Sequence, residues 1–201
     1  MIQLKNVVKR FGDKTIINDL SLDIRKGEMI GLIGPSGCGK STLLNIIGTL
    51  DKKYEGKVII DGQVVTKNNR QSLRIRKNKL GYLFQNYALL DNATVEDNLK
   101  IVSNNKRAMI KVLSELGIKD KFKEKIYTLS GGEQQRVAIA RLILKDPEII
   151  LADEPTGSLD KDNEIIVFEI LKKLKEEGKT IIVVTHEDEI LHYFDRTVKI
   201  G

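Results

Sequence analysis

The segment from Gly34 to Thr42, Gly-Pro-Ser-Gly-Cys-Gly-Lys-Ser-Thr, constrains this chain more than any other, because it matches the pattern G-x-x-x-x-G-K-[ST] at every position. The apolar residues 29–33 before it predict a buried strand, and residues 41–47 after it predict a helix. Between a strand and a helix N-terminus, this pattern binds phosphates. The segment therefore predicts a nucleoside triphosphate site; the alternative is a glycine-rich turn without a ligand.

The residues of this loop have separate expected roles. Its glycines let the backbone curl, so that N–H groups converge on the phosphates. Lys40 should reach the β- and γ-phosphates, the Ser41 hydroxyl should bind Mg²⁺, and Thr42 should contact the α-phosphate. The residues expected to surround the nucleotide are Gly34, Pro35, Ser36, Gly37, Cys38, Gly39, Lys40, Ser41 and Thr42.

Cys38 is the single cysteine of the chain, which excludes an internal disulfide and suits a reducing compartment. A place near a predicted helix N-terminus can make a thiol acidic and open to alkylation, but we expect Cys38 to be a small space-filling side chain. For either role, we expect bound ATP to protect Cys38 from a thiol reagent.

Composition bounds the class of protein. The chain has 201 residues, of which 41% are hydrophobic, enough for one globular domain. The net charge of +6 comes from 34 basic and 28 acidic residues, an excess too modest to establish nucleic-acid binding. No apolar run approaches the roughly 20 residues that cross a bilayer, and the first residues do not form a signal peptide. We expect a cytoplasmic chain that does not itself span a membrane.

The order of patterns predicts an α/β fold with a mostly parallel core sheet flanked by helices, an N-terminal antiparallel part and an inserted helical subdomain. We expect a single domain over residues 1–201, with an ATP-binding core at 1–85 and 146–201 and a helical subdomain at 86–145. The predicted hairpins span 2–25 and 57–65; the strands span 29–33, 79–84, 148–154, 179–185 and 196–200; the helices span 41–47, 70–77, 95–103, 106–116, 130–145 and 160–177.

Polar side chains stand where three of the buried strands end. Ligands of parallel α/β sheets lie beyond the carboxyl ends of the strands, so Gln85, the Asp153–Glu154 pair and His186 should meet at the phosphate site. Asp153 is suited to hold Mg²⁺ through water, and Glu154 to deprotonate a water aimed at the γ-phosphate. Gln85 could reach the metal or that water, and His186 could donate to the γ-phosphate. The alternative is that these strands simply end in polar residues.

Two further features each have a structural and a functional interpretation. Phe11 lies at the bend of the first hairpin, where it could stack on a purine or pack the hairpin. Ser130 is a good helix N-cap, and Gly131 and Gly132 after it would leave the helix end uncovered, as a second anion site. Capping alone would explain Ser130, but two glycines in the first turn cost roughly 1 kcal/mol each relative to alanine.

Together, these residues resemble the nucleotide-binding subunit of ATP-binding cassette (ABC) transporters over essentially the whole chain. The resemblance rests on the phosphate loop, the segment Leu129–Arg136, Gln85, Asp153–Glu154, Ser158–Asp160 and His186, in the family's order. It implies a head-to-tail dimer around two ATP-Mg²⁺, in which Ser130, Gly131 and Gly132 meet the partner's ATP and Asp160 links the two sites. It also implies that Glu154 is the catalytic base, that His186 senses the γ-phosphate, and that Phe11 stacks on adenine.

Within that family, the motifs resemble the branch for lipoprotein release, macrolide export and bacteriocin export. The resemblance implies a partner permease in the membrane, a peripheral position on its inner face, and export or extraction of a peptide, antimicrobial or lipoprotein. A non-transport ABC ATPase acting on DNA or ribosomes is the alternative, although such chains usually carry a long coiled coil or a second cassette. A metabolic P-loop kinase would have no use for the segment Leu129–Gln134, and we expect no direct nucleic-acid partner.

Overall fold

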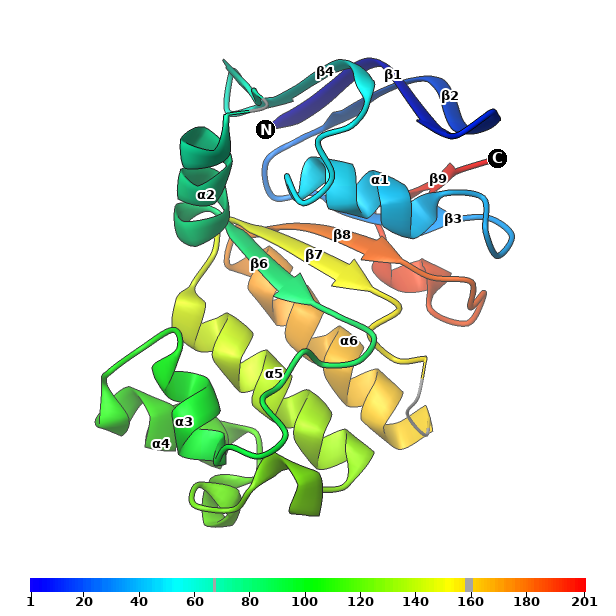
Figure 1. Ribbon diagram of the computed structural model, residues 1–201. Coiled ribbons are helices and arrows are strands. Elements are labelled where there is room, and N and C mark those ends of the chain that lie inside the picture. The colour runs from blue at the N-terminus through cyan, green and yellow to red at the C-terminus, as the bar shows by residue number, and fades with distance from the viewer. Residues whose placement is uncertain (67, 158–160) are drawn as a thin grey trace.

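The computed structural model describes residues 1–66, 68–157 and 161–201, which form two sheets and the helices around them (Figure 1). One sheet is four-stranded and antiparallel, with the order β2-β1-β4-β5. The other is five-stranded and parallel, with the order β6-β7-β8-β3-β9. The predicted α/β fold with a parallel core sheet and an antiparallel N-terminal part is confirmed.

The antiparallel sheet consists of the two predicted hairpins. At the turn of the second hairpin, Asp61 and Gly62 have φ angles of 49° and 75°, as a type I′ turn requires. One face of this sheet is buried, because its apolar residues alternate with polar ones. Its strands are β1 (Ile2–Phe11), β2 (Lys14–Ile24), β4 (Glu55–Ile60) and β5 (Gln63–Val64).

The parallel sheet is covered on both sides, which explains its continuous apolar runs. All five residues of β8 are buried, and so are the first four of β3 and β7. Since the strands are parallel, their carboxyl ends share one edge of the sheet. The strands are β3 (Met29–Ile33), β6 (Leu80–Leu83), β7 (Ile149–Asp153), β8 (Thr180–Val184) and β9 (Arg196–Lys199).

Helices fill the space on either side of this sheet (Figure 1). Helix α1 lies between the two sheets, and α5 and α6 cover the opposite face of the parallel sheet. The α-helices are α1 (Lys40–Ile47), α2 (Asn69–Asn78), α3 (Val95–Lys100), α4 (Lys106–Glu115), α5 (Gly131–Lys145) and α6 (Lys161–Glu176). Short 3-10 turns are η1 (Lys119–Lys121), η2 (Ile126–Thr128) and η3 (Leu191–Tyr193).

Helix α5 belongs to two apolar clusters at once. Ala138, Ile139 and Leu142 pack toward the parallel sheet, whereas Val137 and Ala140 pack against α3, α4 and the turns that follow them. A shift of α5 would therefore disturb the packing of both clusters. The division into a core and a helical subdomain at 86–145 stays a prediction.

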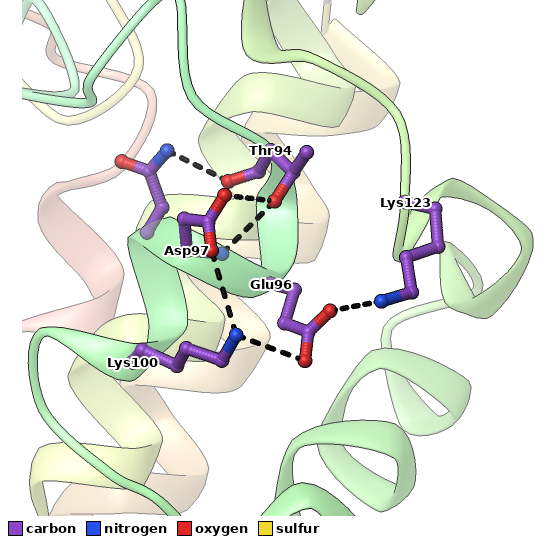
Figure 2. Close-up of polar contacts among 6 residues, drawn as sticks. Thr94, Glu96, Asp97, Lys100 and Lys123 are labelled. Carbon is purple, nitrogen blue, oxygen red and sulfur yellow. Dashed lines mark hydrogen bonds and ion pairs between the residues drawn. The ribbon is translucent and has the colours of Figure 1, made fainter.

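The start of α3 is fixed by polar contacts, which Figure 2 shows. Thr94 caps the helix, because its hydroxyl accepts a 3.1 Å hydrogen bond from the N–H of Asp97. Glu96 forms ion pairs with Lys100, at 3.1 Å, and with Lys123 from the segment after η1. These contacts attach α3 to the chain that leads into α5.

Among the helices of the described segments, none is both long and apolar enough to cross a membrane.

Candidate functional site

The loop between β3 and α1 passes so close to its neighbours at two points that only glycine fits there. Gly34 and Gly39 have φ angles of 149° and 104°, in the region that favours glycine. A Cβ at Gly34 would lie 2.3 Å from the carbonyl oxygen of Ile200, and a Cβ at Gly39 would lie 2.6 Å from Cγ2 of Ile16. The loop therefore passes close to β2 and to the last residues of the chain, and its glycines permit this approach.

Lys40 lies inside the curve of this loop. The side chain is buried, with 5% exposure, and Nζ donates hydrogen bonds to the carbonyl oxygens of Gly34 at 2.7 Å and Pro35 at 3.0 Å. A buried ammonium group whose hydrogen bonds go to neutral carbonyls is well placed to receive an anion. This observation fits the predicted phosphate contact.

Oxygen ligands meet where α1 begins and β7 ends. The Ser41 hydroxyl donates a 2.8 Å hydrogen bond to Oδ1 of Asp153. Burial raises the pKa of Asp153 above its ordinary value, and the hydrogen bond from Ser41 offsets this only in part. A hydroxyl beside a carboxylate is a donor set that suits Mg²⁺ together with phosphate oxygens. The described residues contain no group of three or more His, Cys, Asp or Glu side chains able to hold a metal alone.

The carboxylate of Glu154 lies between two side chains from neighbouring strand ends. Its Oε2 accepts a 3.2 Å hydrogen bond from Nε2 of Gln85, and its Oε1 lies 3.3 Å from Nδ1 of His186. The φ of Glu154 is 45°, so the chain turns sharply directly after β7. The structure thus brings together the three strand-end residues to which the sequence assigns the chemistry, beside Ser41 and Asp153.

A cavity of about 230 Å³ opens between the loop and the first hairpin. Phe11, at its rim, is 56% exposed, with Nζ of Lys9 4.5 Å from the centre of its ring. Ile16 also lines the cavity, although no pattern in the sequence marks it, because only the folded hairpin places it over Gly39. The lining residues are Phe11, Ile16, Ser36, Gly37, Gly39, Lys40, Ser41, Thr42 and Glu154.

Three residues of the predicted loop site lie outside this lining. Gly34 and Pro35 face Lys40 through their carbonyl groups. Cys38 is partly buried against the apolar core, and its Sγ would lie 3.0 Å from a Cβ at Gly34. This packing favours the space-filling interpretation of Cys38.

The N-terminus of α5 is capped by two of its own side chains, and the anion site expected at Gly131 and Gly132 stays a prediction. The Ser130 hydroxyl accepts from the N–H of Glu133 at 3.3 Å, and the Glu133 carboxylate accepts from the N–H of Ser130 at 2.8 Å, which is a capping box. Ser130, Gly131 and Gly132 do not line the cavity of this chain. Asp160 lies outside the described residues.

Comparison with known proteins agrees with this geometry. Residues 17–157 match the family model described as ABC transporter. The macrolide export ATP-binding/permease protein MacB of Campylobacter jejuni is 43% identical over the whole chain, which spans 33% of that protein. The lipoprotein-releasing system ATP-binding protein LolD of Bacteroides thetaiotaomicron is 41% identical, with 98% of this chain and 95% of LolD covered.

Solved structures agree as well. A dimeric structure of the bacterial ABC transporter cassette MJ0796 covers the whole chain and 94% of its own, with a TM-score of 0.91 and 38% identity. A dimeric structure of a post-hydrolysis state of the same cassette, bound to ADP and Pi, matches this chain with a TM-score of 0.90 and 36% identity. The chain spans only about a third of the length of its MacB relatives but nearly all of LolD. With its phosphate loop and strand-end carboxylates in place, the chain thus belongs to the ABC transporter family, as one of its ATPase cassettes.

Proposed function

We propose that this chain binds ATP with Mg²⁺, hydrolyses it at Glu154, and couples the reaction to a permease in the membrane. One observation carries the proposal: the carboxylate of Glu154 is held by Gln85 and His186 at the cavity that the phosphate loop lines. A carboxylate in this position can accept a proton from water aimed at a γ-phosphate.

Each residue has a definite task in the reaction. The Glu154 carboxylate takes a proton from the attacking water, whose oxygen forms a bond to the γ-phosphorus as the bond to the bridging oxygen of ADP breaks. Lys40 and a donor hydrogen bond from His186 stabilise negative charge on the phosphate. Ser41 and Asp153, with Gln85 nearby, would hold Mg²⁺, which when bound neutralises phosphate charge.

A second cassette would complete each site. We propose a head-to-tail dimer in which Ser130, Gly131 and Gly132 of one chain contact the γ-phosphate of ATP on the other. Two observations support this: these residues lie outside the cavity of their own chain, and the similar cassette MJ0796 is dimeric in its solved structures. Asp160 would link the two sites. An identical second chain is the simplest partner.

The relatives suggest the transport task. LolD, which this chain covers almost completely, is an ATP-binding protein of a lipoprotein-releasing system, and MacB joins ATP-binding and permease parts in macrolide export. We therefore propose a peripheral subunit on the inner face of the membrane, which drives export or extraction of a lipoprotein, peptide or antimicrobial through a transmembrane permease. An ABC ATPase that acts on DNA or ribosomes is the less favoured alternative.

The replacement Glu154→Gln tests the assignment of the base. The variant should bind ATP as tightly as the native protein and lose at least about a hundredfold in turnover, because the amide cannot accept the proton. Glu148→Gln, the same change in charge at the other end of β7, is the matched control and should keep full turnover. Turnover in Glu154→Gln close to that of the control would remove Glu154 from the mechanism.

The partner is tested by capture from membranes. The Glu154→Gln protein with ATP and Mg²⁺ should remain dimeric and retain a permease, which mass spectrometry of co-purifying proteins identifies. A permease with a large extracytoplasmic domain would support export or extraction. Recovery of ribosomal or DNA-bound proteins in its place would favour the alternative function.

A further inference from the structure

A buried glutamine joins α5 to the turn that carries Glu154. Gln135 is 1% exposed, and its Nε2 donates a 2.6 Å hydrogen bond to the carbonyl oxygen of Pro155. Pro155 is buried as well and follows Glu154 directly. The amide of Gln135 therefore holds the main-chain carbonyl next to the proposed catalytic base.

The hydrogen bonding of Gln135 is satisfied on one side only. Its Oε1 is buried and has no hydrogen-bond partner in the part of the chain that the structure describes. A buried amide oxygen without a partner lowers stability, and an apolar residue of similar size would avoid that loss. What the amide supplies is the donor to Pro155, which indicates a role in shaping the turn.

The turn depends on such support because of its backbone. Glu154 has a φ of 45°, in a region that residues other than glycine rarely adopt. Its N–H donates to the carbonyl of Val184 at 3.0 Å, and the N–H of Gly157 donates to the carbonyl of Glu154 at 3.2 Å. The hydrogen bond from Gln135 to the carbonyl of Pro155 fixes the turn at a third point. These three contacts fix the backbone from which the Glu154 side chain extends, and its carboxylate then meets Gln85 and His186.

We propose that Gln135 is a positioning residue for ATP hydrolysis, which aligns the Glu154 carboxylate through Pro155 and makes this alignment depend on the position of α5. The inference rests on the proposed function, since it takes Glu154 as the base. Gln135 lies about one helical turn after Gly131 and Gly132. Contact with a second cassette would displace the start of α5. The side chain of Gln135 would then pass this displacement to Glu154 through Pro155.

Replacement of Gln135 by leucine tests the donor. Gln135→Leu keeps a similar volume, and Gln135 does not line the nucleotide cavity. We expect kcat for ATP hydrolysis to fall at least about tenfold, while KM and the Kd for ATP change by less than about twofold. Rates are compared at equal concentrations of protein that binds ATP, so that loss of folded protein is not counted.

Replacement by glutamate gives a readout that a purely structural role would not move. A buried carboxyl group can donate to the Pro155 carbonyl only in its protonated form, and burial favours that form. The turnover of Gln135→Glu relative to the native protein should therefore rise as the pH is lowered from about 8.5 to about 6. The relative turnover of Gln135→Leu should stay constant over the same range.

Asn98 offers a matched control. It is likewise a fully buried amide, with 0% exposure, and it donates to the carbonyls of Leu90 and Thr94 in the helical part of the chain. Asn98→Leu should lower stability and keep kcat; an equal loss of kcat in Asn98→Leu would overturn the role of Gln135. An unchanged kcat in Gln135→Leu with an inactive Glu154→Gln would overturn this inference alone. Full turnover in Glu154→Gln would overturn the proposed function and this inference together.

Discussion

The Ser41 hydroxyl donates a 2.8 Å hydrogen bond to Oδ1 of Asp153, although 112 residues separate the two in the sequence. Ser41 lies in the first turn of α1, and Asp153 is the last residue of β7. The bond brings the end of the phosphate loop next to the carboxylate beside the proposed base. The two oxygens are close enough for a single Mg²⁺ ion to contact both.

Removal of either oxygen should weaken the binding of ATP mainly when Mg²⁺ is present. We expect Ser41→Ala and Asp153→Asn each to raise the Kd for Mg²⁺-ATP about tenfold, which is ~1.4 kcal/mol, because a metal contact is lost. Calorimetric titration with ATP in Mg²⁺ and in EDTA measures this. An equal loss of affinity in both media would show that the two oxygens act on the fold of the loop and not on the metal.

Phe11 should contribute to nucleotide affinity by stacking. The ring is 56% exposed at the rim of the cavity. Stacking of a base on an aromatic ring contributes about 1–3 kcal/mol, so Phe11→Ala should raise the Kd for ATP by about five- to 150-fold, and Phe11→Tyr should leave it nearly unchanged. Leu73→Ala, at an exposed apolar residue on α2, is the control. If Phe11→Ala binds ATP as tightly as Leu73→Ala does, the role of Phe11 is limited to packing the hairpin.

The sequence predicts most of this site because its signals are local. A phosphate loop needs glycines at fixed spacing, and polar residues at the ends of buried parallel strands must share one edge of the sheet. Gln85, Glu154 and His186 meet for that reason. The capping box at α5 also had a local signal, because Ser130 is followed three residues later by Glu133.

The remaining features depend on how distant elements pack. Nothing near Ile16 indicates that it lies over Gly39, and nothing near Gln135 indicates that its amide reaches Pro155. The left-handed backbone of Glu154 is also a tertiary effect, because no glycine or asparagine marks that position. Such contacts join helix faces to turns through side chains, and a one-dimensional pattern does not contain them.

The pair Glu28–Arg196 should make stability depend on pH. Oε1 of Glu28 accepts from Nε of Arg196 at 2.6 Å, and Oε2 accepts from the N–H of Arg25 at 2.7 Å. Burial alone would raise the pKa of Glu28, but the hydrogen bonds from Arg196 and Arg25 outweigh burial and lower it. The folded-state pKa therefore lies below the unfolded-state value, so the carboxylate stabilises the fold above the unfolded pKa and loses this effect as the pH falls through the folded pKa.

The replacement Glu28→Gln tests this dependence. At neutral pH it should lower the free energy of unfolding by about 1 kcal/mol, an amount reduced by the partial exposure of Arg196. The difference from the native protein should shrink as the pH falls below about 4. Urea unfolding over a series of pH values measures it, with Glu177→Gln as a control at an exposed position. A difference that stays constant into the acid range would mean that the charge of Glu28 is not what stabilises the fold.

Gly48 should tolerate no side chain, although its backbone would accept one. Its φ of −72° suits any residue, but a Cβ there would lie 1.1 Å from the hydroxyl oxygen of Tyr82 and 3.0 Å from Cδ1 of Leu151. The end of α1 thus packs directly on β6 and β7. Gly48→Ala should lower the free energy of unfolding by about 1–3 kcal/mol through overpacking.

Tyr82→Leu, whose side chain ends short of the clash, should recover part of that loss, so the double variant should be more stable than the sum of the single effects by about 1 kcal/mol. Denaturant unfolding of the four proteins gives this coupling energy. If the effects of the two replacements on the free energy of unfolding simply add, Tyr82 does not contact Gly48. That result would contradict the packing of α1 on the parallel sheet. This packing sets the position of the phosphate loop, which lies at the other end of the same helix.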